Sequence, residues 1–504
     1  MLHKLLNPLG RFLGMPEVGF PGGVDLPDNK LTADQPIATC PQASLYILPV
    51  KQHIGDACEP LVEVGDHVLL GQTIARSSTY LSAPVHAPTS GKVVKIEEHA
   101  IAHPSGMGLP CIFIEPDGKD TRDESQQPIT DYRNTDPAEL RDRIRRSGIT
   151  GLGGASFPTF IKLIQDQHNP IHTVILNGVE CEPYLTNDHR VMLEYSREIV
   201  CGLDILLHTV GATRGIIAIE DNKPDAAEKV RDAVQAAGFT DVINVQVLPT
   251  RYPQGGEKQL IESVTGKQVP AGRLPMHIGI LCQNVATTKA VYDAVVRGRP
   301  LTERVVTISG DAVPNPGNMR LRIGTPIRNA FSLHGLDNFQ GLHLLHGGPM
   351  MGERLHSHDV PIVKSTTGLL AFRHPTLMLA HHEEDPCIRC GHCVEACPAS
   401  LVPNLLADHC RNEQFEKAET YNIFDCIECG ACSYVCPSHI PLVHYFRFGK
   451  GQLAAIRREK AFAEASRERS EAREARIARE KAEKASRRQR VRKDMAPASD
   501  EKSE

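Results

Sequence analysis

The sequence predicts a multidomain α/β protein with a β domain near its N-terminal end, a helical cysteine-rich region and a charged tail. Three observations support this prediction. The chain has 504 residues, enough for about three or more domains. Strand patterns alternate with helix patterns through its middle, and 41% of its residues are hydrophobic, so it can bury real cores. Two cysteine runs with the same spacing lie between residues 387 and 437.

Charge and cysteine usage limit the class of protein. The net charge is −5, but residues 451–504 hold 16 Lys/Arg and 11 Asp/Glu, whereas residues 1–450 carry a net charge of −10. Seven of the 15 cysteines lie outside the two runs, scattered and odd in number, which does not suit a disulfide framework and indicates a reducing compartment. These seven are Cys40, Cys58, Cys111, Cys181, Cys201, Cys282 and Cys410.

Neither a signal peptide nor a membrane-spanning helix is expected. The first 14 residues contain a Pro and two Gly where a signal peptide has its apolar core, and no small-residue cleavage site follows. No apolar run reaches the roughly 18 residues that a membrane-spanning helix needs. We therefore expect a cytoplasmic protein, and peripheral attachment to a membrane stays open.

After an N-terminal extension (residues 1–36), residues 37–118 are predicted to form a β domain. Short apolar alternations, for example at 45–50 and 93–96, are separated by Gly and Pro turns. This pattern is typical of a small, strand-rich module.

Two phased segments in this region, residues 59–72 and 82–93, resemble the barrel-sandwich domain of biotinyl and lipoyl carriers. A carrier needs a lysine exposed at a hairpin tip. The only lysines between residues 52 and 101 are Lys92 and Lys95, which follow the Gly91 turn within a strand. We therefore interpret the domain as a structural module without a carrier role.

Residues 130–300 are predicted to form an α/β domain. Asp136 is the expected N-cap of its first helix, Pro137 the first helical residue and Gly148 the C-cap. Strands then alternate with helices, which favours a mostly parallel sheet that seats ligands at its strand ends. The predicted strands are 172–176, 215–220 and 242–248, and the predicted helices are 223–237, 257–264 and 288–296.

Residues 301–365 read as a small β-rich module that resembles a β-grasp (SLBB-like) fold. A turn is expected at Pro314–Gly317 and a further strand at 343–345. That strand ends in the glycine-rich segment 347–352.

The two cysteine runs lie in the predicted two-cluster, ferredoxin-like α domain, residues 366–448. Both runs read C-x2-C-x2-C-x3-C-P, the spacing by which bacterial ferredoxins hold [4Fe-4S] clusters. The fourth cysteine of each run ligates the other cluster. Zinc sites usually space their ligands as separated C-x2-C pairs, and disulfides do not favour three thiols in seven residues. The predicted ligand sets are Cys387, Cys390, Cys393 and Cys436 for one cluster and Cys426, Cys429, Cys432 and Cys397 for the other.

A glycine-rich loop at residues 148–162 is the second candidate site. Its backbone could approach a phosphate closely. As a dinucleotide fingerprint it is imperfect, because a helix precedes it and Ser156 stands at the third glycine position. On its own, the loop fits a phosphate site and a tight structural turn equally well.

Three later segments, at residues 176–190, 252–258 and 282–285, gather amides, glycines and carboxylates at strand ends and at a helix start. Taken singly, Glu180 and Glu182 fit surface salt-bridge partners, and Asn284 fits a turn former. Taken together, the loop and these segments resemble the NADH-binding flavoprotein subunit of respiratory complex I. The positions that match its motifs are Gly151, Gly153, Gly154, Phe157, Lys162, Asn177, Glu180, Glu182, Gly255, Glu257 and Asn284.

This resemblance implies FMN, cradled by the loop and Asn177, with NADH stacked above it against Phe157. Seven positions depart from that family's motifs, and an arginine and three carboxylates are lost among them. These positions are Leu152, Ser156, Phe160, Val179, Gly256, Gln283 and Ala286.

The whole architecture, over about residues 15–450, resembles the family of C subunits of Rnf/Rsx-type ion-translocating electron transport complexes. The resemblance implies an oxidoreductase subunit on the cytoplasmic face of the bacterial inner membrane. It also implies electron exchange between NAD(H) and a ferredoxin, through FMN, two [4Fe-4S] clusters and membrane partners that move Na⁺ or H⁺. No acid–base pair for hydrolysis is evident, so no catalytic residue is predicted.

Two alternatives stay open. In the first, the chain is a non-catalytic relay or scaffold whose nucleotide site has decayed, and only its clusters are active. In the second, it is a nucleic-acid-binding redox sensor. Because the basic tail has no aromatic interleaving and no base-reading module accompanies it, we expect no nucleic-acid partner.

The predicted tail, residues 449–504, has a helical composition. Residues 451–493 carry 15 Lys/Arg against 7 Asp/Glu without a sustained apolar stripe. The pattern favours a solvated, partly disordered helix. Contact with anionic lipid head groups or with an acidic partner is the alternative.

Overall fold

The computed structural model of the chain describes residues 19–103, 106–166, 168–374 and 383–494. Parts of the predicted extension, of the ferredoxin-like domain and of the tail therefore lie outside the described residues. The chain divides into two compact units. One contains the residues up to Asn404 together with Asp425–Val443, and the other contains Leu405–Phe424 and the residues from His444 onward.

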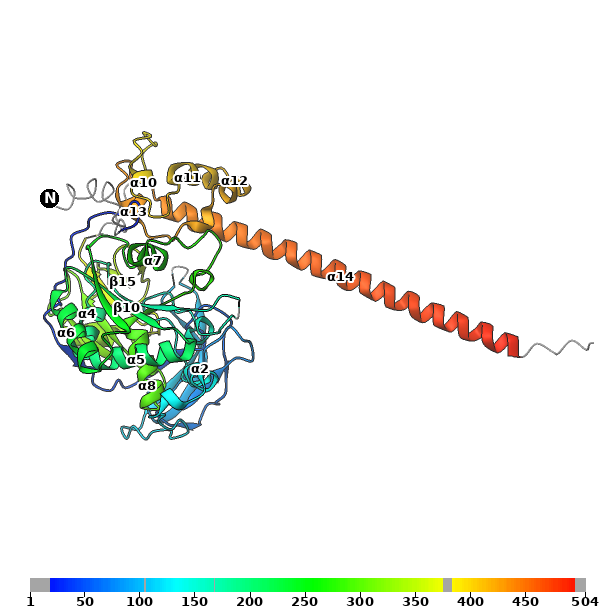
Figure 1. Ribbon diagram of the computed structural model, residues 1–504, viewed down its shortest axis with the longest axis horizontal. Helices are drawn as coiled ribbons and strands as arrows, with labels where there is room; N and C mark the ends of the chain where they lie inside the picture. Colours follow the sequence, from blue (N-terminus) through cyan, green and yellow to red (C-terminus); the bar gives the residue numbers. More distant parts are fainter. Residues whose placement is uncertain (1–18, 104–105, 167, 375–382, 495–504) are drawn as a thin grey trace, which may run out of the picture. The chain divides into compact units, whose positions relative to one another are not determined.

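A parallel four-stranded sheet in the order β11-β10-β9-β12 lies at the centre of the first unit (Figure 1). Each strand is followed by at least one helix, as the alternating pattern predicts. The strands are β9 (Thr173–Gly178), β10 (Arg214–Glu220), β11 (Ile243–Leu248) and β12 (Ile280–Asn284). The helices that follow them are α4 (Asn187–Glu194) and α5 (Ser196–Val210), α6 (Pro224–Ala236), α7 (Glu257–Thr265) and α8 (Val285–Val296).

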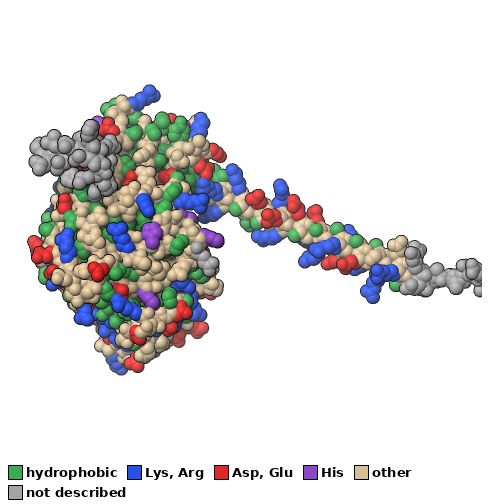
Figure 2. All heavy atoms as spheres, viewed as in Figure 1, with side chains coloured by type: hydrophobic (Ala, Val, Ile, Leu, Met, Phe, Trp, Pro, Cys, Tyr) green, Lys and Arg blue, Asp and Glu red, His purple; other side chains and the backbone are tan. Residues whose placement is uncertain are grey.

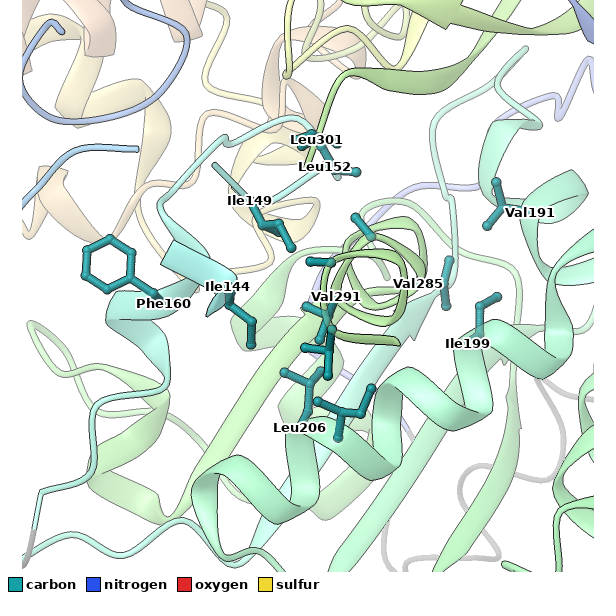
Figure 3. Packing of buried hydrophobic residues seen from close by; sticks show 14 of the residues in the cluster. Ile144, Ile149, Leu152, Phe160, Val191, Ile199, Leu206, Val285, Val291 and Leu301 are labelled. Carbon is teal, nitrogen blue, oxygen red and sulfur yellow. The ribbon is translucent and has the colours of Figure 1, made fainter. Parts of the chain in front are cut away.

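Alternate residues of β9 enter two different cores. Val174 and Leu176 are buried in the core that α5 and α8 share, whereas Ile175 lies in a second core with residues of α7. This follows from the two-residue side-chain period of a strand. Figure 3 shows apolar side chains of α5 and α8, such as Leu206 and Val291, within the first core. Because helices cover both faces of this sheet, the ends of its strands are the part that remains open to a ligand.

Side-chain caps explain where α2 and α8 begin. The Asp136 carboxylate accepts a hydrogen bond from the Ala138 N–H at 2.8 Å and starts α2 (Pro137–Arg146), as predicted. At α8 the Asn284 side chain accepts from Ala286 and Thr287, so this helix begins three residues before the predicted one.

Two small sheets form the β domain. One has the order β2-β8-β7-β4 and the other β3-β5-β6, and residues of both share one apolar core. Lys92 lies within β7, paired with His67 and Glu115 of the neighbouring strands. The strands are β2 (Tyr46–Pro49), β3 (Glu59–Pro60), β4 (His67–Val68), β5 (Thr73–Arg76), β6 (Val85–His86), β7 (Gly91–Ala100) and β8 (Gly108–Pro116).

The predicted β-grasp region forms part of a six-stranded sheet, β1-β14-β13-β17-β15-β16, beside α9 (Ile327–Leu333). This sheet takes in strands on both sides of the predicted range 301–365, because β1 comes from the N-terminal part and β17 follows residue 365. The strands are β1 (Ile37–Thr39), β13 (Glu303–Ser309), β14 (Gly317–Arg322), β15 (His343–His346), β16 (Glu353–Arg354) and β17 (Gly368–Phe372).

The cysteine-rich region carries two short helices, α10 (His392–Glu395) and α13 (Ala431–Tyr434), which contact each other. In the second unit, Phe415 of α12 (Phe415–Thr420) packs edge-to-face against Phe448 of α14 (Leu442–Asp494). Helix α11 (Pro403–Arg411) completes that unit.

The tail is helical as predicted, and α14 continues without a break to the last described residue, Asp494. Figure 2 shows acidic and basic side chains interspersed along it. None of the helices in the described residues combines the length and the apolar character that crossing a membrane requires.

Two helical glycines offer a test of this packing. A Cβ at Gly202 of α5 would lie 2.3 Å from the Thr288 carbonyl oxygen of α8, whereas a Cβ at Gly451 of α14 would meet open space. We expect Gly202→Ala to destabilise the central domain by about 1–3 kcal/mol through overpacking. Gly451→Ala should stabilise its helix by up to about 1 kcal/mol. Thermal unfolding monitored by circular dichroism measures both, and an unchanged midpoint in G202A would contradict the packing.

Candidate functional site

The glycine-rich loop joins α2 to α3 (Thr159–Lys162) and is closed by its own backbone. The Gly151 N–H donates to the Phe157 carbonyl at 2.8 Å, and the Ser156 N–H donates to the Gly151 carbonyl at 3.1 Å. Gly154 has a φ of +108° and Ser156 a φ of +46°. Ser156 thus holds the left-handed conformation that favours glycine at the very position where the motif expects one.

Two asparagines mark the strand ends that face this loop. Asn177 of β9 and Asn284 of β12 are register partners. The Asn177 amide donates to the Gly255 carbonyl at 2.8 Å, and the Asn284 amide donates to the Asp188 carboxylate at 2.6 Å. Asn284 is therefore a helix cap that also fixes Asp188, rather than a simple turn former.

Glu180 and Glu182 are not surface salt-bridge partners. Glu180 has a φ of +52°, and its carboxylate accepts from the backbone N–H groups of Asp188 at 2.6 Å and His189 at 3.2 Å. The Glu182 carboxylate accepts from the N–H groups of Met350 at 3.0 Å and Met351 at 2.8 Å. Both carboxylates therefore order loops around the site.

Burial raises the pKa of several carboxyls near this edge of the sheet. It raises the pKa of Glu182 to about 7, against the opposing effect of the two N–H groups and of Lys30. Burial, and then the neighbouring Glu180, raises the pKa of Asp188 to about 7. Burial raises the pKa of Glu220 to about 7 as well, although Lys223 lies 3.2 Å away. These groups can hold or release a proton near neutral pH.

Lys30 was not predicted as a site residue. Its ammonium donates to the backbone carbonyl oxygens of Glu180 at 2.7 Å, Glu182 at 2.9 Å and Leu185 at 2.7 Å. It thereby fixes the segment that bears both glutamates. No local motif surrounds Lys30, and its partners lie 150 or more residues away, so the sequence carries no signal for this role.

A cavity of about 870 Å³ opens where these segments meet. Of the eleven predicted cofactor-binding residues, eight line it and three do not. Those that line it are Gly153, Gly154, Asn177, Glu180, Glu182, Gly255, Glu257 and Asn284. The other three are Gly151, Phe157 and Lys162. Lys162 does not line the cavity, but its ammonium lies 3.1 Å from each carboxylate oxygen of Glu257, which does.

Other parts of the chain also line the cavity. The β domain contributes residues 51–54, and the glycine-rich segment 347–352 contributes most of its residues. Ile427 of the second cysteine run also lines the cavity. At Gly348 a Cβ would lie 2.3 Å from the Glu182 carboxylate, so glycine is needed there for this close approach.

Most departures from the complex I motifs lie away from this cavity. Leu152, Phe160 and Val179 are nearly fully buried in apolar cores, and only Ser156 and Gly256 of the seven departing residues line the cavity. Five of the seven departing positions therefore contribute nothing to the cavity wall.

The two cysteine runs share one backbone conformation. Arg389 and Glu428, at equivalent positions, both have a φ of +57°, and the following glycines Gly391 and Gly430 have φ values of +85° and +81°. None of the 15 cysteines, all of which lie in the described residues, forms a disulfide.

Thiols within each predicted ligand set interact electrostatically. Burial raises the pKa of Cys393, and the next thiols that raise it are Cys436, Cys387 and Cys390. Burial likewise raises the pKa of Cys429 to about 12, with Cys426 and Cys397 as its neighbouring thiols. Cys393 thus interacts with Cys436 of the second run, and Cys429 interacts with Cys397 of the first run. We call Cys387, Cys390, Cys393 and Cys436 the outer set and Cys397, Cys426, Cys429 and Cys432 the inner set.

Two residues close in sequence to the cavity-lining segment 253–257 contact the backbone of the cysteine runs. The buried Tyr252 hydroxyl donates to the Cys429 carbonyl at 2.6 Å, and the Gln259 amide donates to the Pro398 carbonyl at 3.3 Å. Tyr252 and Cys429 belong to one apolar cluster, and Cys181, which lines the cavity, packs against it. The outer set is more open, because Cys387 and Cys390 are exposed.

The residues present fit a flavin nucleotide. The Ser156 hydroxyl and the Asn187 side-chain carbonyl are buried without a hydrogen-bond partner among the described residues, and both residues line the cavity. A ligand with polar edges would satisfy them. The loop glycines leave room for close approach, since a Cβ at Gly154 would meet no atom within 4 Å.

Family comparisons agree with this arrangement. Residues 18–119 match the RnfC barrel sandwich hybrid domain, residues 144–293 the Nuo51 FMN-binding domain, residues 305–353 the SLBB domain, and residues 380–472 the 4Fe-4S dicluster domain. A flavin-binding α/β domain joined to a dicluster domain defines the class of flavin- and iron–sulfur-containing electron-transfer proteins.

Individual relatives show which family within this class the chain belongs to. The C subunit of an ion-translocating oxidoreductase complex from Yersinia pestis is 46% identical over 457 residues, which is 90% of this chain and 72% of that protein. The protein of the same name from Pseudomonas aeruginosa is 45% identical over 90% of this chain and 58% of its own length. The chain belongs to the family of C subunits of ion-translocating oxidoreductase complexes, a family of electron-transfer subunits.

Two solved structures align with part of the chain. An NAD⁺-reducing [NiFe]-hydrogenase in its H2-reduced state aligns with a TM-score of 0.45 at 17% identity, over 66% of this chain and 69% of that one. The air-oxidised state of such an enzyme aligns with a TM-score of 0.44 at 19% identity, over 56% of this chain and 54% of that one.

The raised pKa of Glu182 predicts a pH-dependent stability. Between its ordinary value of 4.5 and about 7, the folded chain keeps a proton that the unfolded chain has released, so stability falls as pH rises through this window. Glu182→Gln should make this fall less steep. Melting temperatures across the window measure the effect. Glu228→Gln, at an exposed position on α6, controls for the loss of one negative charge. An identical pH profile in wild type and E182Q would contradict the burial of a titrating carboxyl.

Proposed function

We propose that this chain exchanges electrons with NAD(H) through FMN bound in the 870 Å³ cavity and passes them along two [4Fe-4S] clusters. In this proposal it acts on the cytoplasmic face of the bacterial inner membrane as a peripheral subunit. Its complex couples electron transfer between NAD(H) and ferredoxin to ion translocation. The proposal rests on the family to which the chain belongs and on the geometry of that cavity.

A single observation carries the proposal: one cavity is lined both by the glycine-rich loop and by Ile427. Ile427 is bonded directly to Cys426 of the inner set, so the cavity reaches the immediate surroundings of the proposed cluster ligands. A redox cofactor in this cavity and a cluster on the inner set would be neighbours, as electron transfer between them requires.

When bound, FMN supplies the chemistry of the site, because a flavin accepts a hydride and releases single electrons. The chain's own residues hold and shape the site. The open backbone at Gly153 and Gly154 suits a close approach to a phosphate. Asn187 and Ser156 offer unsatisfied polar atoms, and Asn177 fixes the opposite wall through Gly255.

The buried carboxyls assist in a different way. Glu182 and Asp188 have pKa values near 7, so they can be neutral when an anionic cofactor lies beside them. Ionised carboxylates in the same places would repel a phosphate or a reduced ring. The Met350 and Met351 N–H groups hold the Glu182 carboxylate in place, and the first N–H groups of α4 hold that of Glu180.

The inner set is the proposed first electron acceptor and the outer set the second. Tyr252 and Cys429 belong to one apolar cluster against which the cavity-lining Cys181 packs. Exposed Cys387 and Cys390 place the outer cluster towards a partner, either a ferredoxin or another subunit. A largely buried inner set and a more exposed outer set suit a relay that delivers electrons to a second protein.

The deciding experiment is anaerobic purification of the full chain with counts of iron, sulfide and flavin. We expect eight irons, eight sulfides and one FMN per chain, as two cubane clusters and one flavin require. The flavin absorption band should bleach on addition of NADH. Clusters without flavin, or a flavin band indifferent to NADH, would favour the scaffold alternative.

Substitutions at two glycines distinguish loss of the cofactor cradle from the effect of backbone strain. Gly154 and Gly238 both have positive φ and open space at the Cβ position, but only Gly154 lines the cavity. We expect Gly154→Val to lose bound FMN and NADH oxidation while its iron content stays at the wild-type level. Gly238→Val carries a similar backbone strain and should keep its flavin. Equal flavin contents in the two variants would place the cofactor elsewhere.

The proposed order of clusters can be tested with ligand variants. Cys429→Ser should prevent NADH from reducing either cluster, although the flavin band still bleaches. Cys387→Ser should leave the inner cluster reducible. Electron paramagnetic resonance of each NADH-treated variant, with its iron content, records the outcome. Reduction of the outer cluster in C429S would reverse the order.

A further inference from the structure

A second cavity, of about 300 Å³, lies where the β domain, the central α/β domain and the six-stranded sheet meet. Seven basic and three acidic residues line it, a net charge of +4. It shares no lining residue with the larger cavity. It is formed within a single compact unit of the chain.

All three carboxylates in this cavity are already paired. Asp120 binds Arg322 at 2.5 Å, and Asp293 binds both Lys289 at 2.6 Å and Arg297 at 2.8 Å. The third carboxylate, of Glu303, lies 3.8 Å from Arg320. Four of the seven basic residues are therefore paired with the three carboxylates of the cavity.

The other three arginines form no ion pair with a carboxylate of the described residues, although Arg304 interacts electrostatically with Asp188 and Arg122 with Asp120. Arg304 is only 4% exposed, and its guanidinium donates to backbone carbonyl oxygens, including that of Leu152 at 3.0 Å. Arg122 and Arg299 are exposed, and no carboxylate of the described chain forms an ion pair with either of them. The cavity thus has a buried cation in its wall and two unpaired guanidinium groups that can reach a ligand.

This concentration of positive charge favours an anion. Like charges held around a confined, partly desolvated space repel one another unless a counter-charge enters. Guanidinium groups bind phosphate oxygens in a bidentate manner. A net charge of +4 is better matched by a polyanion than by a single carboxylate.

The size of the cavity limits the ligand. Its volume of about 300 Å³ is at the lower end of small-molecule pockets and about one third of that of the larger cavity. A whole dinucleotide would not fit. We propose that this cavity binds a small diphosphate anion, either free pyrophosphate or the diphosphate of a nucleotide.

The site has a direct connection to the glycine-rich loop. Leu152 lines the diphosphate cavity, and the next residue, Gly153, lines the larger cavity. Arg304 holds the Leu152 carbonyl, and the Thr287 hydroxyl accepts from the Leu152 N–H at 2.8 Å. A diphosphate in the small cavity therefore restrains the residue that leads into the proposed cofactor cradle.

Isothermal titration calorimetry of the purified full chain with sodium pyrophosphate, at constant ionic strength, tests the proposal. Saturable binding with one site is expected. Arg122→Ala with Arg299→Ala should weaken it by roughly tenfold or more, since both lost contacts are charge-assisted. Lys229→Ala with Arg231→Ala removes two exposed positive charges on α6, outside the cavity, and should leave binding unchanged.

A parallel titration with ADP distinguishes the source of the diphosphate. Tighter binding of ADP than of pyrophosphate assigns the site to a nucleotide, and the reverse assigns it to the free anion. Absence of saturable heat for both probes would overturn the proposal. Equal affinities in wild type and R122A/R299A would also overturn it, because binding would then occur elsewhere, for example at the glycine-rich loop. This readout does not depend on flavin, clusters or NADH oxidation.

Discussion

The site depends on the alignment of strand ends in one parallel sheet. Asn177 and Asn284 stand at the same level because β9 and β12 are in register. The Asn177 amide holds the Gly255 carbonyl, and the Asn284 amide holds the Asp188 carboxylate at the start of α4. Helices on both faces bury the sheet, so its carboxyl edge is the place where polar groups can gather.

Charge burial at this edge is compensated by backbone groups more than by ion pairs. Glu180 and Glu182 receive backbone N–H donors, and Lys30 donates to three carbonyls. Such contacts fix the loops but leave the carboxyls of Glu182 and Asp188 only partly stabilised as anions, which is consistent with their raised pKa values. A site of this kind can receive negative charge without a matching cluster of cations.

Local patterns determined what could be predicted from the sequence. The cysteine spacing, the Asp136 cap and the alternation of strands and helices involve near neighbours in sequence, and each corresponds to a feature of the fold. Lys30 could not be found in this way, because its partners lie 150 or more residues away. The contribution of β-domain residues 51–54 to the cavity depends on domain packing, which no local pattern encodes. Glu180 and Glu182 were recognised through a resemblance, but the backbone partners of Glu182 at 350 and 351 were not.

The shared backbone of the two cysteine runs makes one difference between them stand out. Arg389 adjoins Cys390 in one run, whereas Glu428 adjoins Cys429 in the other, and the two side chains leave the chain from the same conformation. The reduction potential of an iron–sulfur cluster depends on nearby charge. A cation beside the outer cluster stabilises an added electron there, and an anion beside the inner cluster disfavours one. With clusters bound at both sets, this charge difference would make the outer cluster the easier of the two to reduce.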